Sequence, residues 1–343
     1  MTREPIVLIT GANGEVGHGL IKYLSQQAHV PEIVAFDLKP LDEALRPLVK
    51  RYLVGDILDN ALLESLHQDY EIDTIYHLAA LLSTSAEKFP ELAHNVNVQG
   101  TVQLLHMAMR EGKSRQKAVK FIYPSSIAVY GLPDLQTKAQ AGAVAENDYL
   151  FPTTMYGCNK LYTEHLGRYY TNHYQQLSDM PSVGLDFRCL RFPGLISAFT
   201  VPSGGTSDYA PEMIHAAAKG EAYTCFVRED TAIPFMAMPD GIQALIQLAE
   251  APRETLNSQV YNVTGFSATA AEIATLVQAE FPNAQISYEA SAGRQGIVDT
   301  WAADVDDSRA RKDWHWRPAY DIQRTFADYL FPNIRERYTE TML

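Results

Sequence analysis

The sequence predicts an α/β protein with a doubly wound parallel sheet and a second, smaller lobe. An apolar run at residues 6–9 leads through a glycine-rich turn into a helical apolar pattern, and a second apolar run at residues 33–36 ends in Asp37. Strand, turn, helix, strand and acid in this order are typical of a nucleotide-binding βαβ unit. The length of 343 residues supports the second lobe, because it is long for a single core.

The turn after the first apolar run predicts a dinucleotide site. Gly11 allows a sharp turn, Gly14 lets a pyrophosphate approach the backbone, and Gly17 lets the helix pack closely on the strand. The free N–H groups at the start of the helix then face the phosphates. A glycine-rich turn without a ligand is the alternative. The residues predicted to contact the cofactor here are Gly11, Asn13, Gly14, Glu15, Val16 and Gly17.

Asp37 predicts which dinucleotide is bound. It follows Gly17 by twenty residues and ends the second apolar run. Its carboxylate can accept hydrogen bonds from both ribose hydroxyls of the adenosine, and it would repel a 2′-phosphate. We therefore expect NAD rather than NADP.

Charge and composition exclude several functions. The formal net charge is −13, whereas a nucleic-acid surface needs clustered Lys and Arg. No signal-peptide pattern is present, and no apolar run is as long as a membrane span. Cys158, Cys189 and Cys225 are far apart, so we expect buried thiols and no metal site. The expectation is a cytoplasmic protein that acts on a small molecule without nucleic acid or membrane partners.

Two further strand ends predict cofactor contacts. Asp56 and Ile57 follow an apolar run and could hold the adenine, although Asp56 as the N-cap of a helix over residues 58–66 is an equal alternative. A buried strand over residues 74–80 ends in small side chains that allow a cofactor to lie against the backbone. These cofactor contacts are Leu78, Ala79 and Ala80.

Polar residues around these strands divide into structural and functional candidates. His77 stands alone in an apolar run, so we expect a core histidine, while Ser83 just beyond is a candidate substrate contact. Asn97 lies in a predicted helix over residues 91–112 and is expected to bond backbone groups of a neighbouring turn. The strand over residues 119–123 delivers Ser126 to the sheet edge. Residues 132–148 are expected to form a surface loop.

The pair Tyr156 and Lys160 is the strongest chemical signal. Residues four apart share a helix face, so both side chains can point at one site. A phenol has a pKa of about 10, and a nearby ammonium with a positive nicotinamide should lower it. Tyr156 could then take the proton of an alcohol while its hydride leaves for NAD, with Ser126 orienting the oxygen. A chance occurrence on an amphipathic helix is the alternative.

Together these motifs resemble the extended short-chain dehydrogenase/reductases, which include sugar-nucleotide epimerases and dehydratases. The motifs are Gly11-x-x-Gly14-x-x-Gly17, Asp56, Leu78-Ala79-Ala80, Asn97, Ser126 and Tyr156-x-x-x-Lys160. The resemblance implies a Rossmann fold, Ser126 and Tyr156 at the substrate oxygen, and Lys160 on the nicotinamide ribose. It also implies that Asn97 supports the backbone near the catalytic residues, and it favours the adenine role of Asp56.

The second half is similar to the short-chain-type L-threonine 3-dehydrogenases. The similarity rests on residues 190–197, 204–210, 223–226 and 301–316. It implies NAD-dependent oxidation of the threonine hydroxyl to 2-amino-3-oxobutyrate, with Pro193 among the cofactor contacts. The implied substrate contacts are Thr206 at the carboxylate, Asp208 near the ammonium and Trp301 as an apolar wall. In the structural alternatives Gly204-Gly205 is only a flexible loop, Asp208 a helix cap and Trp301 part of the core.

Two arginines keep a rival function open. Arg228 and Arg294 resemble positions that grip a sugar-nucleotide diphosphate, so an epimerase or dehydratase is the alternative enzyme. A non-catalytic NAD-binding regulator is the third hypothesis, and the intact Tyr/Lys pair counts against it. The segments 132–148 and 175–182 look longer than is usual for the family.

The domain boundaries follow from the same pattern. We expect an NAD-binding domain over residues 1–193 plus about 237–267 and a substrate-binding lobe over about 194–236 plus 268–343. The resemblance also implies a homodimer that pairs through the helix bearing the tyrosine.

Overall fold

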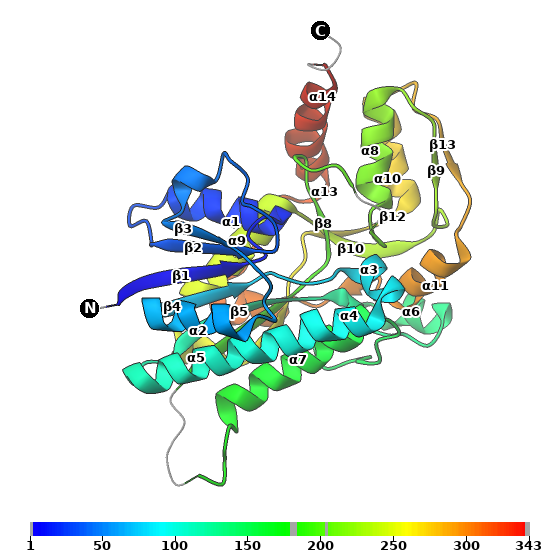
Figure 1. Ribbon diagram of the computed structural model, residues 1–343. Helices are drawn as coiled ribbons and strands as arrows, with labels where there is room; N and C mark the ends of the chain where they lie inside the picture. Colours follow the sequence, from blue (N-terminus) through cyan, green and yellow to red (C-terminus); the bar gives the residue numbers. More distant parts are fainter. Residues whose placement is uncertain (1–2, 179–183, 203–204, 340–343) are drawn as a thin grey trace. The chain divides into compact units, whose positions relative to one another are not determined.

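The computed structural model describes residues 3–178, 184–202 and 205–339 and contains a seven-stranded sheet (Figure 1). The strand order is β11-β7-β5-β4-β1-β2-β3, and β1 pairs in parallel with both β2 and β4. The predicted doubly wound α/β fold is therefore confirmed. The strands are β1 (Glu4–Thr10), β2 (Ile33–Asp37), β3 (Arg51–Val54), β4 (Tyr70–His77), β5 (Val119–Ser126), β7 (Leu185–Phe192) and β11 (Val260–Asn262).

The strand order reverses at β1, and this feature determines where a ligand can bind. The chain leaves β1 towards β2 and β3 on one side, and it later returns to add β4 and β5 on the other. In open parallel sheets the crevice beyond the carboxyl ends of two such strands is the ligand site. The predicted glycine turn follows β1, and Leu78 to Ala80 follow β4.

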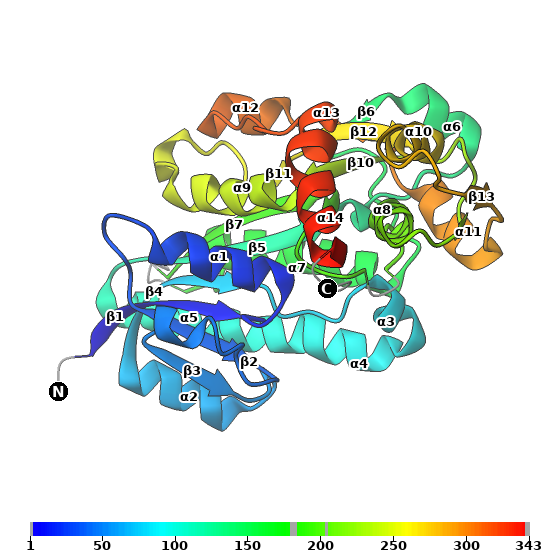
Figure 2. The ribbon, with the colours of Figure 1, turned by 90° about the horizontal axis from the view of Figure 1, so that it is seen from above.

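Helices cover both faces of this sheet. α1 (Glu15–Ser25) buries Leu20, Ile21 and Leu24, the apolar stripe that the sequence predicts. α2 (Asn60–Asp69) and α5 (Thr101–Arg115) pack on each other and on β4. α1 lies on the opposite face from α5 (Figures 1 and 2). The predicted tyrosine-bearing helix is α7 (Met155–Asn172).

The predicted helix over residues 91–112 is interrupted. α4 (Pro90–His94) runs into a π-helical turn, Asn95–Gly100, before α5 begins. Such turns widen a helix locally and are frequent at functional sites. Asn97 lies within this turn, where it bonds the backbone beyond β4. α3 (Ser83–Lys88) precedes α4.

A second group of elements surrounds three small sheets. β10 pairs with β12 in antiparallel and with β8 in parallel, β13 pairs with β9, and β14 with β6. α8 packs against α10 and α14 (Figure 2). The strands are β6 (Ala143–Val144), β8 (Gly194–Ile196), β9 (Tyr223–Cys225), β10 (Ala232–Ala237), β12 (Phe266–Thr269), β13 (Ile286–Tyr288) and β14 (Asp304–Val305). The helices are α6 (Leu135–Ala141), α8 (Tyr209–Lys219), α9 (Met238–Glu250), α10 (Ala270–Glu280), α11 (Ala292–Thr300), α12 (Ser308–Trp314), α13 (Ile322–Arg324) and α14 (Phe331–Thr339).

The chain divides into two compact units. The first comprises Met1–Ser125, Cys158–Leu190 and Leu245–Val260, and the second comprises Ser126–Gly157, Arg191–Ala244 and Tyr261–Leu343. The predicted boundaries differ from this division chiefly between Ser126 and Gly157, which the sequence assigned to the cofactor domain. The assignment of cofactor and substrate to separate domains stays a prediction.

Two local predictions are wrong. Residues 132–148 are not simply a surface loop, because they contain α6 and β6 and bury Lys138 and Glu146. Asp134 caps α6 by accepting a hydrogen bond from the N–H of Thr137 at 2.7 Å. Of the three cysteines, Cys158 is exposed rather than buried.

Some of the sequence predictions concern residues that the structure does not describe. Residues 179–182 of the predicted longer segment, and Gly204, lie outside the described residues. Within the described part of the chain, no helix is both long and apolar enough to cross a membrane.

Candidate active site

The turn after β1 has the close backbone packing that its glycines predict. Gly11 has a φ of +68°, and a Cβ there would lie 2.5 Å from the backbone nitrogen of Ala79. A Cβ on Gly17 would lie 2.4 Å from the carbonyl oxygen of Ala12. Gly14 differs, since its Cβ would meet only the carbonyl of Gly11 at 3.3 Å. Two glycines therefore allow the fold, and the third leaves the backbone accessible.

The start of α1 fits a bound dinucleotide. Gly14 is its N-cap residue and no side chain caps the helix, so the first N–H groups can be satisfied by a ligand anion. Asp37 accepts hydrogen bonds from the N–H of Asn13 at 2.9 Å and of Lys39 at 3.0 Å. These bonds place its carboxylate beside the turn, and each oxygen keeps a second lone pair for a ribose hydroxyl. The residues present therefore fit NAD.

Asp56 does not cap α2. The cap is Asp59, whose side chain accepts from the N–H groups of Ala61 and Leu62. Asp56 is exposed and its Oδ1 accepts from the N–H of Leu58 at 2.9 Å. The alternative interpretation of Asp56 as an N-cap is wrong, while its adenine role stays a prediction.

Three other predicted cofactor residues and Ser83 follow β4 in the chain, and Ile57 follows β3. Leu78, Ala79 and Ala80 are partly buried and directly follow the strand. Ile57 is buried against Gly100, where a Cβ would lie 2.5 Å from its Cδ1. Ser83 is the first residue of α3.

Asn97 supports the backbone of the site. Its Oδ1 accepts from the N–H of Leu81 at 2.8 Å, and its Nδ2 donates to the carbonyl of Leu81 at 3.0 Å and to Oδ1 of Asn159 at 3.3 Å. The side chain is 2% exposed. Asn97 thus links the segment after β4 to the residue before Lys160. The role of Asn159 was missed, and its position beside Lys160 is the signal that could have indicated it.

Lys160 is held beneath the end of β5. Its Nζ donates to the carbonyl of Pro124 at 2.6 Å and lies 4.4 Å from the centre of the Tyr123 ring. Burial lowers the pKa of Lys160 to about 8. The ammonium is therefore anchored two residues before Ser126.

Tyr156 and Ser126 are hydrogen-bonded to each other. Gly157 makes this possible, because a Cβ there would lie 2.1 Å from the carbonyl oxygen of Ala128. Its N–H donates to Oγ1 of Thr154 at 3.0 Å, which fixes the first turn of α7. A glycine directly after the tyrosine is the sequence signal for this close approach.

The pKa of Tyr156 differs from the expectation. Burial raises the pKa of its phenol, and the hydrogen bond with Ser126 opposes this rise only in part. In the protein without a cofactor, burial therefore outweighs any lowering of this pKa by a neighbouring cation, because the buried phenolate loses hydration.

His77 is a core residue, as predicted. It is 1% exposed, and its Nδ1 and Nε2 lie 2.7 Å and 2.8 Å from the hydroxyls of Thr10 and Thr101. Burial, assisted by the charge of Lys160, lowers the pKa of His77 to about 3. The imidazole is neutral and structural.

Three of the predicted substrate residues, Thr206, Asp208 and Trp301, lie in the second unit, whereas Ser83 lies in the first. Thr206 is buried, and Asp208 immediately precedes α8 and accepts from the N–H of Gly205 at 2.6 Å. Asp208 therefore fixes the preceding turn rather than capping the helix with its side chain. Trp301 is 5% exposed. Pro193 is buried between β7 and β8.

The two arginines of the rival interpretation are engaged by the protein. Arg228 forms two hydrogen bonds of 2.9 Å with the carboxylate of Asp299 and contacts Asp230 at 3.1 Å. The guanidinium of Arg294 lies 4.3 Å from the ring centre of Phe226. The charge of Arg228 is thus largely compensated.

Sequence reasoning missed a buried polar network. Arg191 is fully buried and donates to the hydroxyl of Tyr130 at 2.9 Å and to the carbonyl of Glu146 at 2.8 Å. Tyr130 in turn donates to Oδ1 of Asn262 at 2.7 Å. The network fixes the chain directly before Pro193, and periodicity could not reveal it because its members are distant in sequence.

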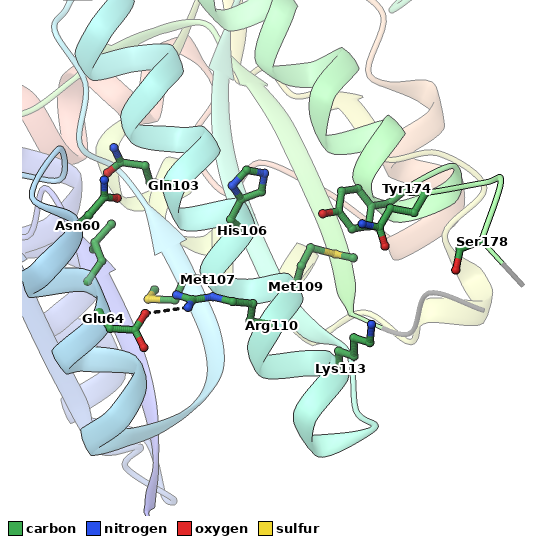
Figure 3. Close-up of a pocket in the computed structure, with 12 residues that line it drawn as sticks. Asn60, Glu64, Gln103, His106, Met107, Met109, Arg110, Lys113, Tyr174 and Ser178 are labelled. Carbon is green, nitrogen blue, oxygen red and sulfur yellow. Dashed lines mark hydrogen bonds and ion pairs between the residues drawn. The ribbon is translucent and has the colours of Figure 1, made fainter. Parts of the chain in front are cut away.

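Figure 3 shows a pocket of about 560 Å³ on α2, α5 and the chain after α7. His106, Met109 and Lys113 project from α5 into its lining. None of its lining residues is a predicted site residue, so the pocket is not part of the candidate site.

The parallel sheet and the glycine-rich turn after β1 define a class of dinucleotide-dependent enzymes. Residues 7–264 match the NAD dependent epimerase/dehydratase family, and the chain belongs to that family. The predicted extended short-chain class is thereby confirmed.

Individual relatives are similar over almost the whole chain. The mitochondrial L-threonine 3-dehydrogenase of Bos taurus is 34% identical over 316 residues, which cover 92% of this chain and 79% of that protein. A solved partial consensus L-threonine 3-dehydrogenase is 36% identical with a TM-score of 0.85, covering 97% and 100% of the two chains. A monomeric L-threonine 3-dehydrogenase from a metagenome is 34% identical with a TM-score of 0.84, covering 97% and 99%.

Proposed function

We propose that this chain oxidises the side-chain hydroxyl of L-threonine to 2-amino-3-oxobutyrate with NAD. The hydrogen bond between Ser126 and Tyr156, one helical turn before Lys160, is the observation that carries the proposal. The names of the relatives support threonine as the substrate.

The protein's own groups handle the substrate proton. The hydroxyl of Ser126 donates a hydrogen bond to the substrate oxygen and sets its distance from Tyr156. Tyr156 takes the proton from that oxygen as the C3–H bond breaks. Bound NAD supplies the hydride acceptor. Lys160 supplies the positive charge that favours the phenolate.

Most of the proposed cofactor contacts lie in the first unit, and Pro193 lies in the second. The turn from Gly11 to Gly17 holds the diphosphate, and Asp37 accepts from the adenosine ribose and disfavours NADP. Asp56 and Ile57 hold the adenine. Asn97 acts through the backbone, since its amide is used by Leu81 and Asn159. The remaining proposed contacts are Leu78, Ala79, Ala80, Lys160 and Pro193.

The proposed contacts with the amino acid are those that the sequence predicts. Ser83 and Thr206 contact the substrate, with Thr206 at the carboxylate. Asp208 adds negative charge near the ammonium. Trp301 supplies an apolar wall that helps exclude water.

The test is a spectrophotometric assay. L-Threonine and NAD added to the purified protein should raise the absorbance of NADH. A flat trace with threonine, together with turnover of a UDP-sugar, would replace the proposal with the epimerase function. The ion pair between Arg228 and Asp299 counts against that alternative, because this guanidinium is already bound.

Assembly and location complete the proposal. Phe89, Leu92 and Tyr169 are exposed large side chains on the first unit, with exposures of 58%, 48% and 40%. They favour pairing of two chains through α7 and its neighbour, although one relative is described as monomeric. Sedimentation as a single chain at micromolar concentration would reject the homodimer. The sequence analysis is the basis for proposing a cytoplasmic location, and cell fractionation tests it.

A further inference from the structure

The segment that contains α6 holds the chain directly before Trp301. The N–H of Leu132 donates to the carbonyl of Thr300 at 2.8 Å. The Nζ of Lys138 donates to the carbonyl of Val298 at 2.9 Å. Both acceptors lie in the last turn of α11, where carbonyl groups lack helical partners.

The same segment holds the chain directly after Trp301. β6 pairs in parallel with β14, which begins three residues beyond the tryptophan. The N–H of Asp306 donates to the carbonyl of Val144 at 3.0 Å. Trp301 therefore lies between two attachments to one segment, and its side chain is 5% exposed.

The carbonyl of Val298 connects Lys138 to Trp301. It accepts both the Nζ of Lys138 at 2.9 Å and the backbone N–H of Trp301 at 3.1 Å. A cation at the C-terminus of a helix is also favoured by the helix dipole. The lysine thus stabilises the turn that sets the direction in which the tryptophan leaves α11.

Lys138 is an unusual choice for a purely structural position. It is 7% exposed, and within the described residues no carboxylate lies within ion-pair distance of its Nζ. Asp299, the next residue after Val298, is bound by Arg228 and by Nε2 of Gln295 at 2.7 Å. Burial lowers the pKa of Lys138 to about 8. The charges of Asp299 and Asp230 favour the ammonium, but burial outweighs them, whereas a methionine would fill the same space without this desolvation cost.

We propose that Lys138 is a positioning residue that fixes Trp301 for substrate binding through the carbonyl of Val298. The proposal rests on the proposed function for the contact between Trp301 and the amino acid. It assigns a role to the segment 132–148, which contains α6 and β6. Lys138 is not among the residues proposed to contact the cofactor or the reacting atoms.

The first experiment compares kinetic constants. Lys138→Met removes the donor and keeps the length of the side chain, so KM for L-threonine should rise about tenfold, near the lower end of the effect of losing one charged hydrogen bond. The kcat should stay within about twofold and KM for NAD should be unchanged. Lys138→Gln, which keeps an N–H donor, should recover part of the loss.

A matched control is available in the first unit. The Nζ of Lys120 also donates to a backbone carbonyl, that of Ala249, at 2.9 Å. Lys120→Met removes the same kind of bond and should leave KM for threonine unchanged. An equal rise of KM in both methionine variants would overturn the proposal.

A double-mutant cycle tests the route of the effect. Trp301→Phe should raise KM, and adding Lys138→Met to it should then have less effect than in the unmodified protein, because both changes act on one contact. Fully additive effects would contradict a route through Trp301. If Lys138→Met does not fold, the cycle is carried out with Lys138→Gln, whose effect should be smaller and equally non-additive.

Hydrogen exchange separates this proposal from the proposed function. Without any substrate, Lys138→Met should accelerate exchange of the amides of residues 301 and 302 and leave those of β1 unchanged. Unchanged exchange at 301 would overturn the positioning role. A protein that does not oxidise threonine but shows the faster exchange would refute the function and retain the link between Lys138 and Trp301.

Discussion

The surroundings of Tyr156 keep its phenol neutral before the reacting complex forms. Burial raises its pKa, and the hydrogen bond with Ser126 compensates only in part. Lys160 is anchored on Pro124 with a pKa lowered to about 8, so it remains largely protonated at pH 7. This geometry keeps a positive charge in place one helical turn away. A neutral resting tyrosine is compatible with proton transfer, since only the reacting complex needs the phenolate.

Removal of the phenolic oxygen tests this residue. Tyr156→Phe should lower kcat with threonine at least about a hundredfold, the usual effect of losing a general base. The affinity for NAD, measured by titration calorimetry, should change less than about threefold, because the ring remains.

Tyr162→Phe is the matched control on the same helix. Tyr162 is 52% exposed, so its variant should keep the activity of the unmodified protein. Loss of NAD binding in Tyr156→Phe that parallels the loss of turnover would mean that the residue has been misassigned.

Residue chemistry could be predicted only in part from the sequence. The spacing of Tyr156 and Lys160 indicated a shared helix face, and the isolated position of His77 indicated a core histidine. The support of Lys160 by Pro124, and of Asn159 by Asn97, depends on backbone groups and on partners far away in the chain. Side-chain patterns carry no information about such contacts.

At the scale of elements, the close packing of α1 on the turn before it determines whether the phosphates can be reached. Gly17 allows the helix to approach Ala12, and the helix start is left without a side-chain cap. The glycine spacing predicted this arrangement correctly. The π-helical turn Asn95–Gly100 and α6 were not predicted. Periodicity does not reveal a one-residue insertion in a helix, and the polar composition of residues 132–148 does not indicate the short helix α6, in which only Lys138 is buried.

A glycine substitution tests the packing of α1. Gly17→Ala should lower the free energy of unfolding by about 1–3 kcal/mol despite the better helix propensity of alanine, because its Cβ would collide with a backbone carbonyl. Binding of NAD should weaken in parallel. Urea unfolding and titration with NAD measure the two effects.

Gly296→Ala in α11 is the matched comparison. A Cβ at Gly296 would meet nothing within 4 Å, so this variant should be as stable as the unmodified protein or slightly more so. Equal behaviour of the two variants would show that the close approach at Gly17 has no energetic importance.

At the scale of the whole molecule, a buried histidine connects the centre of the sheet to a covering helix. His77 on β4 lies between Thr10 on β1 and Thr101 on α5. Its pKa is about 3 in the folded protein, against an ordinary value of 6.5. Below pH 6.5 this histidine therefore binds a proton in the unfolded chain but not in the folded chain. The free energy of unfolding decreases as the pH falls from 6.5 towards 3.

Acid unfolding measures this contribution. Between pH 7.5 and pH 5.5 the unmodified protein should lose about 1.4 kcal/mol of unfolding free energy through His77. His77→Gln should be less stable at pH 7.5 but should lack this part of the pH dependence. His18, His106 and His215 also have lowered pKa values, and they contribute equally to both proteins. Parallel pH curves for the two proteins would show that His77 is already protonated in the fold.

The overall fold was the most predictable level. Each βαβ unit is specified locally, by an apolar run, a turn and a helical pattern, and the parallel order follows from such units. The division into units was less accessible, because Ser126–Gly157 belongs with residues far downstream. That association depends on contacts such as the bond between Lys138 and Val298, which no local pattern encodes.

The most direct test follows the hydrogen on C3 of threonine. With L-threonine carrying deuterium at C3 and unlabelled NAD, mass spectrometry of the product should find one deuterium in NADH and none released to solvent. The rate should also fall by a primary isotope effect if hydride transfer limits turnover. NADH that forms without deuterium, or deuterium that is lost to water, would contradict direct transfer from threonine and with it the proposed function.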